Sequence, residues 1–306
     1  MSLRTRDDAA APIHGHRLAV WTAVAGLVAN IVIVLTGSLV RLTGSGLGCP
    51  EWPRCTTDSF VTTPEMGIHG LIEFGNRTMG IIVGLITLAL LYAAVRHGRR
   101  TRLTVGLAVG ALVGVLAQGF IGGLSVTQEL APEIVAVHFL VSMVIVAAVT
   151  VLVDVLRRPD AHAGLPTHRE IGWLVTALPV LLAIVLVLGT VVTGSGPHAG
   201  DENARRFGLD PAAMSQAHAD TVLVFMGVQL AVLVALRITL APAHQRRAAG
   251  LLLVASLVQG LIGFAQYASG LPVPLVAAHV LGAALVTAAT THLVLAMRRT
   301  TTAEVA

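Results

Sequence analysis

Four polar side chains recur at matching positions inside apolar segments of this chain, and their chemistry suits a metal centre. His218 and His279 lie in two segments of the second half of the sequence, and Asn76 and His138 lie in the corresponding segments of the first half. The separations are 279 − 138 = 141 and 218 − 76 = 142 residues. A near-constant offset indicates an internal duplication. Neutral imidazole is the commonest metal ligand in proteins, so the set predicts ligand-binding sites in duplicate.

The segments around these side chains are long and apolar. The chain has 306 residues, of which 55% are hydrophobic and 12% are charged, a composition typical of integral membrane proteins. Eight segments approach or exceed the ~20 residues with which a helix crosses a bilayer. We expect these helices at about 18–41, 68–95, 103–124, 132–156, 171–194, 211–237, 247–268 and 273–297.

The duplication predicts how the eight helices are grouped. The tetrapeptide Thr-Gly-Ser-Gly ends an apolar segment at 43–46 and does so again at 193–196. We therefore expect an all-α integral membrane protein in which eight transmembrane helices form two pseudo-symmetric four-helix bundles. Residues 1–156 would form the N-terminal half, 157–170 a cytoplasmic linker and 171–306 the C-terminal half.

Arginine placement predicts the orientation in the membrane. All 20 basic residues are arginines, and most lie before the first helix, after the last, or in the loops after the second, fourth and sixth. Because cytoplasmic loops carry the excess of basic residues, we expect both termini of this multi-pass cell-membrane protein in the cytoplasm. The basic character is thus a topology signal, and membrane lipid rather than nucleic acid is the expected surrounding. The exceptions, in outward-facing segments, are Arg41, Arg54, Arg77, Arg205 and Arg206.

The four repeated side chains share one depth. With a rise of ~1.5 Å per helical residue, His138, His279, His218 and Asn76 lie roughly 9–12 Å below the outer surface. An ionisable side chain at this depth is costly unless it is paired or ligated. A single histidine there is about as well explained by an interhelical hydrogen bond, but three at one depth favour a shared ligand.

Bis-histidine ligation of a haem iron between facing helices fits this pattern best. His218 and His279 would form one complete pair, whereas the first half offers His138 opposite Asn76. Zinc or copper fits less well, because no second cluster of Cys, Asp or Glu lies at this depth. A quinone site could use one histidine but would not explain the pairing.

The first outer loop contains the only two cysteines of the chain, Cys49 and Cys55. Oxidising surroundings outside the cytoplasm permit a disulfide, with Pro50 and Pro53 stiffening the short loop. The pair is interpreted either as a structural staple or as a redox-active dithiol. The second half has no counterpart, so the pair belongs to the first-half site alone.

Charged residues surround this loop. Glu73 lies about one helical turn before Asn76, and it either pairs with Arg77 or Arg41 or accepts a proton during oxidation of a substrate. Arg41 and Arg77 lie at the outer rim, where haem propionates would need cationic partners.

The chain resembles the haem A synthase family, in its Cys-pair-containing bacterial type, over essentially its whole length. The resemblance rests on Val40-Arg41-Leu42-Thr43-Gly44-Ser45-Gly46-Leu47 with Cys49-Pro50, Trp52-Pro53 and Cys55, and on Glu73-Phe74-Gly75-Asn76-Arg77, Val135-Ala136-Val137-His138-Phe139, Gln216-Ala217-His218-Ala219-Asp220 and Ala277-Ala278-His279.

The resemblance implies oxidation of the C8 methyl of haem O to a formyl group, with water as the oxygen source, to give haem A for terminal oxidase assembly. His218 and His279 would be the axial ligands of a haem b cofactor, His138 a substrate-haem ligand, Glu73 the catalytic carboxylate, and Cys49 and Cys55 a disulfide. Haem O is the implied substrate, and haem O synthase and oxidase assembly factors are the implied partners.

One position departs from the family pattern, which is commonly Glu-x-x-His-Arg. Asn76 replaces that histidine and is a poor iron ligand. His69, two turns outward on the same helix, would lie ~10 Å higher, so we expect a substrate iron ligated through His138 alone. The alternatives are a dihaem b-type electron carrier, which Asn76 disfavours, and a haem exporter or chaperone, which would need neither Glu73 nor the cysteine pair.

Overall fold

The computed structural model describes residues 13–98, 101–158, 162–163, 168–297 and 299–300. Within these ranges the chain forms eight long α-helices, one short 3-10 helix and one pair of two-residue strands. The predicted linker at 157–170 lies partly outside the described residues. Some of the arginines that predict the orientation in the membrane also lie outside them, namely Arg4, Arg6, Arg99, Arg100 and Arg298. The elements are α1 (Ile13–Leu42), η1 (Pro64–Met66), α2 (Gly67–His97), α3 (Arg102–Thr127), α4 (Pro132–Arg157), β1 (His162–Ala163), α5 (Arg169–Ser195), α6 (Pro211–Ile238), α7 (Ala243–Ala268), α8 (Val273–Met297) and β2 (Arg299–Thr300).

The eight predicted helices are confirmed, and their ends carry recognisable start signals. Pro132 and Pro211 occupy the first turns of α4 and α6, where a missing N–H costs nothing. Asp210 caps α6 by accepting from the N–H groups of Ala212 and Ala213, as an N-cap aspartate does. All eight helices are long and apolar enough to cross a membrane.

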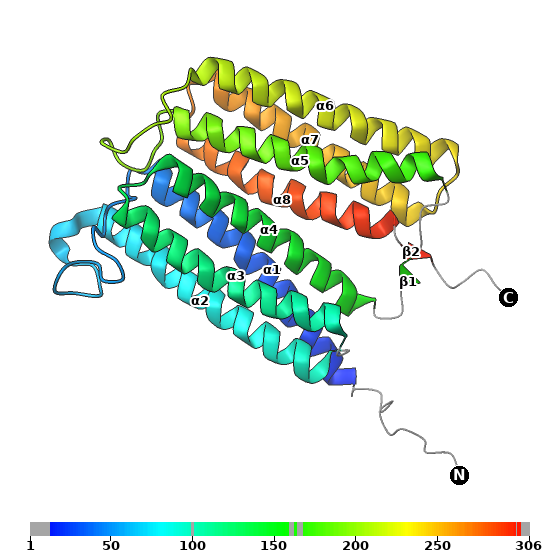
Figure 1. Cartoon of the computed structure of the whole chain (residues 1–306), viewed down its shortest axis with the longest axis horizontal. Helices are drawn as coiled ribbons and strands as arrows, with labels where there is room; N and C mark the ends of the chain where they lie inside the picture. The colour runs from blue at the N-terminus through cyan, green and yellow to red at the C-terminus, as the bar shows by residue number, and fades with distance from the viewer. Residues whose placement is uncertain (1–12, 99–100, 159–161, 164–167, 298, 301–306) are drawn as a thin grey trace, which may run out of the picture.

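The helices run side by side in two groups of four (Figure 1). Helices α1–α4 form one layer of the molecule and α5–α8 form the other, joined where α1 and α4 pack against α8 and where α4 meets α5. The long loops after α1 and α5 lie at one end, called here the loop end (Figure 1). The other end carries the start of α1 and the end of α8 and is called the termini end. The all-α eight-helix prediction is therefore confirmed.

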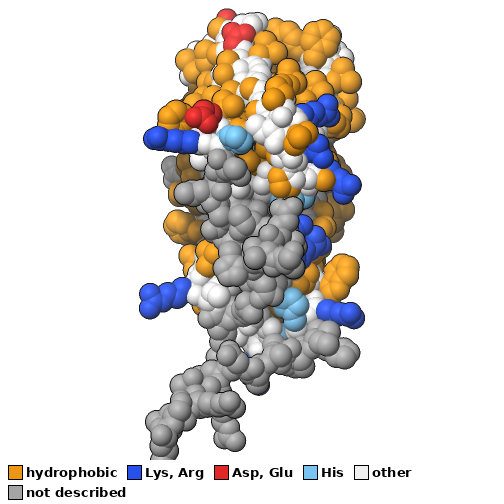
Figure 2. All heavy atoms as spheres, turned by 90° about the vertical axis from the view of Figure 1, so that its right-hand side faces the viewer, with side chains coloured by type: hydrophobic (Ala, Val, Ile, Leu, Met, Phe, Trp, Pro, Cys, Tyr) orange, Lys and Arg blue, Asp and Glu red, His pale blue; other side chains and the backbone are white. Residues whose placement is uncertain are grey.

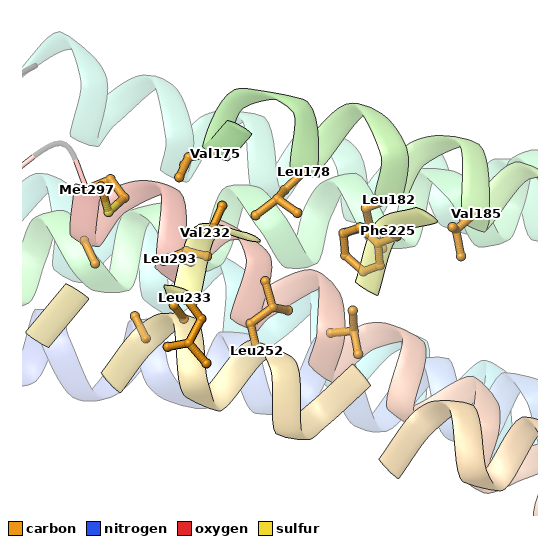
Figure 3. Close-up of a cluster of buried hydrophobic side chains, with 14 of the residues drawn as sticks. Val175, Leu178, Leu182, Val185, Phe225, Val232, Leu233, Leu252, Leu293 and Met297 are labelled. Atoms are coloured by element: carbon orange, nitrogen blue, oxygen red, sulfur yellow. The ribbon is translucent and has the colours of Figure 1, made fainter. Parts of the chain in front are cut away.

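Each half has its own apolar core. In the second half, residues of α5, α6, α7 and α8 interlock between the helices, among them Leu178, Phe225, Val232 and Leu252 (Figure 3). Met143 of α4 joins this cluster, so the two halves share a continuous interior. Most of this cluster lies closer to the termini end of the molecule than the histidines do. The polar site therefore lies on the loop-end side of the core.

The outer surface is as apolar as a bilayer requires. Trp21 and Trp173 are 67% and 61% exposed, on matching helices α1 and α5 near the termini end. Amphipathic indoles are enriched at the membrane–water interface, so these two tryptophans are suited to anchor the halves at one bilayer surface.

Candidate functional site

The two histidines of the second half face each other. His218 of α6 and His279 of α8 have ring centroids 6.4 Å apart, with their planes at 71°. A metal–imidazole bond of about 2.0–2.1 Å, with roughly 1.1 Å more from the nitrogen to the ring centre, would place two axial rings about 6.3 Å apart. The spacing therefore matches two imidazoles bound to opposite sides of one iron.

The hydrogen bonds of this pair leave ring nitrogens free for a ligand. Nδ1 of His218 lies 3.1 Å from the carbonyl oxygen of Val185. A carbonyl can only accept, so Nδ1 carries the proton and Nε2 keeps a lone pair, the usual orientation of a metal-bound imidazole. Nδ1 of His279 is buried and has no hydrogen-bond partner among the described residues.

Glycines on neighbouring helices make room for the histidine rings. A Cβ at Gly189 of α5 would lie 3.3 Å from Cε1 of His218, and one at Gly263 of α7 would lie 2.9 Å from Cε1 of His279. A Cβ at Gly263 would therefore require the ring of His279 to shift. The glycines thereby make room for the Cε1 edge of each imidazole against the neighbouring helix.

Two glutamines complete the duplicated site, and the sequence reasoning missed them. Nε2 of Gln118 donates to the carbonyl of His138 over 2.8 Å, and Nε2 of Gln259 donates to the carbonyl of His279 over 2.7 Å. Their separation, 259 − 118 = 141, equals that of the histidines. The sequence therefore contained a signal for the two glutamines, because they form a second pair of polar residues at the same spacing inside apolar helices.

The first half has only one imidazole at the corresponding place. His138 of α4 packs over Gly122 of α3, whose Cβ would lie 3.3 Å from Cε1, and its buried Nδ1 has no partner among the described residues. Asn76 of α2 instead accepts a hydrogen bond from Thr36 of α1 over 2.8 Å. The amide is thus held by a neighbouring helix, and the second ligand position holds no imidazole.

His69 and His198 have partners at the loop end. Nδ1 of His69 lies 2.9 Å from Oγ of Ser45, and Nε2 of His198 lies 2.9 Å from the carbonyl oxygen of Leu271. His69 joins the start of α2 to the first outer loop, and His198 joins the loop after α5 to the turn between α7 and α8. His69 therefore connects α2 to the first outer loop rather than taking the place of Asn76.

Glu73 lies beneath the first outer loop and is 5% exposed. One carboxylate oxygen accepts from the backbone N–H of Cys49 over 2.7 Å, and the other accepts from Nε and a terminal nitrogen of Arg77 at 3.1 and 2.6 Å. The pairing expected with Arg77 is present. Each oxygen accepts at least one hydrogen bond, so in this conformation Glu73 fastens the cysteine loop to α2.

Arg77 uses its whole guanidinium group in this junction. Besides Glu73, it donates to the carbonyl oxygens of Cys49, Glu51 and Arg54, each over 2.9 Å. These bonds equal the five N–H donors of the side chain. All five donors of Arg77 thus contact Glu73 or the loop, and the expected contact of Arg77 with a haem propionate stays a prediction.

The loop itself is closed by a disulfide between Cys49 and Cys55, both fully buried. Met66 packs against it, with its sulfur 3.4 Å from the sulfur of Cys55. Trp52 lies over Gly123 of α3 so closely that a Cβ there has no room. The cysteine loop is therefore anchored to α2 by charge and to α3 by an aromatic ring.

Hydrogen bonds at the loop end join the segments around the two copies of the Thr-Gly-Ser-Gly repeat. Arg41 at the end of α1 donates to the carbonyl oxygen of Thr193 at the end of α5 over 2.6 Å. The N–H of Gly46 donates to the carbonyl oxygen of Gly200 over 2.9 Å. Arg41 and Gly46 thus join the two halves at the loop end.

Together these features test whether a haem fits. The described residues contain no group of three His, Cys, Asp or Glu side chains suited to a small metal ion. A porphyrin supplies four ligands itself, so two facing imidazoles are sufficient. The unpartnered ring nitrogens, glycine contacts and ring spacing fit a haem in the second half, and the first half offers one imidazole.

The fold and the site define an eight-span helical membrane protein with a facing histidine pair in one half. The family described as cytochrome oxidase assembly protein, COX15-CtaA, matches residues 19–200. This match covers more than half of the chain, which belongs to that family.

The chain is similar to curated relatives over part of their length. The chain is 32% identical to the heme A synthase of Lysinibacillus sphaericus over 185 residues, which cover 56% of this chain and 57% of the relative. It is 29% identical to the heme A synthase of Geobacillus kaustophilus over 181 residues, 56% and 55% of the two chains. For that of Bacillus cereus strain AH187 the identity is 30% over 177 residues, 56% of each. The chain thus spans little more than half the length of these relatives.

Proposed function

We propose that this protein is a haem A synthase that oxidises the C8 methyl of haem O to a formyl group, for terminal oxidase assembly. The observation that carries the proposal is the inequality of two related sites. One half has a facing histidine pair, whereas the other has one histidine, an asparagine and a carboxylate under a disulfide loop. A dihaem electron carrier would need two complete pairs.

The C-terminal half is the proposed cofactor site. His218 and His279 would hold haem b from opposite sides, with Val185 and Gln259 fixing the two histidines. Bound haem b would supply one-electron transfer, by which electrons from the substrate could leave.

The N-terminal half is the proposed substrate site. His138 would hold haem O from one side, while Asn76 offers no second strong ligand. Ligation by one imidazole suits a substrate that must bind and leave. Arg41, which ends α1 and donates one hydrogen bond to Thr193, is the proposed partner of a propionate.

The reaction is a four-electron oxidation in which a methyl group and one water become a formyl group, four protons and four electrons. Two successive hydroxylations by water, followed by loss of one water, give this balance. Glu73 is the proposed proton acceptor. Its carboxylate accepts from Cys49 and Arg77 at rest, so a shift of the loop would free an oxygen to accept a proton.

The setting of the reaction is also proposed. The termini end would face the cytoplasm, and the loop end would face outward across the cell membrane. Haem O synthase is the proposed supplier of substrate, and oxidase assembly factors are the proposed recipients of the product.

Cells that make haem O but no haem A provide the test. On expression of the chain, extracted pigments should contain hydroxymethyl and formyl haem, and Glu73→Gln should lower their yield by about 10² or more. If the extracted pigments contain haem O but no hydroxymethyl or formyl haem, the result would exclude the enzyme and favour a carrier or transporter.

A further inference from the structure

A second polar site lies at the termini end, far along the helices from the histidines. The end of α6 and the start of α7 border a shallow hollow of about 650 Å³ that is largely open to the surroundings. Its lining consists of Arg237, Arg246 and Arg247 together with Ala243 and Gly250. Three of the five residues are arginines and none is acidic. The hollow is therefore strongly cationic.

The positive charge of this hollow is not neutralised within the described part of the chain. The ion pairs found there join Arg77 to Glu73 and Arg205 to Glu133, so the three arginines of the hollow have no carboxylate partner among the described residues. Guanidinium groups stay charged at all physiological pH values. An anion in the hollow would meet three fixed cations.

The start of α7 adds to this potential. Its N-cap residue is Pro242, which provides no side-chain cap. The N–H of Gln245 donates to the carbonyl of Pro242, so the N–H groups of Ala243 and His244 are those left for an acceptor. The positive end of the helix dipole lies at the same place. Phosphate groups bind at helix N-termini for these reasons.

The floor of the hollow has space for such a group. Gly250 lies two turns into α7, and a Cβ built on it would meet nothing within 4 Å. Gly250 thus leaves this part of the lining without a side chain.

Apolar side chains flank the cations. Ile238 and Leu240 are 76% and 81% exposed at the end of α6, and Leu251 is 59% exposed on α7. Figure 2 looks onto the termini end and shows arginine side chains at its edge beside hydrophobic ones. A ligand with an anionic head and hydrocarbon chains would match both surfaces, whereas a free phosphate would use only the first.

We propose that Arg237, Arg246 and Arg247 form a binding site for the phosphate head group of an anionic phospholipid, with its acyl chains along Ile238 and Leu251. Basic pockets between transmembrane helices at a bilayer surface bind such head groups. The site is independent of the proposed haem chemistry, because it lies at the opposite end of the bundle.

Native mass spectrometry of the full-length protein in detergent tests the site, with phosphatidylglycerol as the probe and phosphatidylcholine as the zwitterionic comparison. We expect one tightly bound phosphatidylglycerol per chain. The triple variant Arg237→Gln/Arg246→Gln/Arg247→Gln should bind it at least tenfold more weakly. Gly250→Leu should also weaken binding, because it fills the hollow without changing the charge.

The matched control is Arg17→Gln/Arg102→Gln/Arg157→Gln, which removes the same charge elsewhere at the termini end. This control should retain the tight phosphatidylglycerol. Equal loss in both triple variants, or equal binding of phosphatidylcholine, would overturn the proposal, as would displacement of the lipid by millimolar inorganic phosphate. Gly250→Leu keeps the test decisive if the triple variant fails to fold.

Discussion

The backbone N–H of Cys49 donates to the carboxylate of Glu73 over 2.7 Å. This bond joins the disulfide loop to the residue proposed to accept protons, and Arg77 closes the junction from the other side. The position of the loop and the availability of the carboxylate therefore change together. A shift of the loop away from α2 would expose an oxygen of Glu73.

Replacement of Arg77 tests this junction. Arg77→Lys keeps the charge but cannot reproduce five hydrogen bonds in a planar fork, so amide hydrogen exchange in residues 49–55 should become about tenfold faster or more. Arg54→Lys is the control, because Arg54 donates within the loop only to the carbonyl of Thr57. Equal exchange in both variants would show that Arg77 does not hold the loop.

Removal of the disulfide should weaken the protein without releasing the loop. Cys49→Ser/Cys55→Ser opens a short covalent ring, for which chain entropy predicts a loss of about 2 kcal/mol in unfolding free energy. The variant should melt at a lower temperature in a thermal scan, while Arg77 and Trp52 keep the loop docked. If amide hydrogen exchange in residues 49–55 of this variant were as fast as in Arg77→Lys, the disulfide and not Arg77 alone would hold the loop, which would contradict the prediction.

The two glutamines should act on different sites. Gln259→Leu removes the donor to the carbonyl of His279, and Gln118→Leu removes the equivalent donor to His138. We expect Gln259→Leu to broaden or shift the low-spin haem b spectrum and Gln118→Leu to leave it unchanged but slow the conversion of haem O. Identical effects on the haem b spectrum would argue against separate sites.

Asn76 provides a gain-of-ligand test. In the proposed substrate site Asn76→His adds a second imidazole to that of His138, so in cells that make haem O the purified variant should show a second low-spin signal. Tighter retention of the substrate should also slow turnover. Asn76→Gln is the control and should give no new signal. If Asn76→His also gives none, the two positions do not face one substrate.

Much of this arrangement follows from the sequence because membrane helices are long and their polar residues are few. The eight helices, the layer that contains His218 and His279, and the cysteine pair could all be predicted. The association of Gln259 with His279 was detectable, because Gln259 and Gln118 are separated by the same number of residues as the two histidines. The five bonds of Arg77 were not, because they depend on the path of the cysteine loop, which apolar periodicity does not determine.

The hollow at the termini end could not be predicted for a related reason. Arginines at the ends of α6 and α7 indicate topology in any membrane protein. Only their convergence around Gly250 distinguishes a binding site from a general charge bias, and that convergence depends on how the two helix ends pack.

The haem content of purified histidine variants tests the central claim, that the two halves hold different haems. After expression in cells that make haem O, His138→Ala should keep one low-spin haem b per chain and yield no formyl haem. His279→Ala should lose the low-spin haem b signal. An intact low-spin haem b signal in His279→Ala would contradict the account.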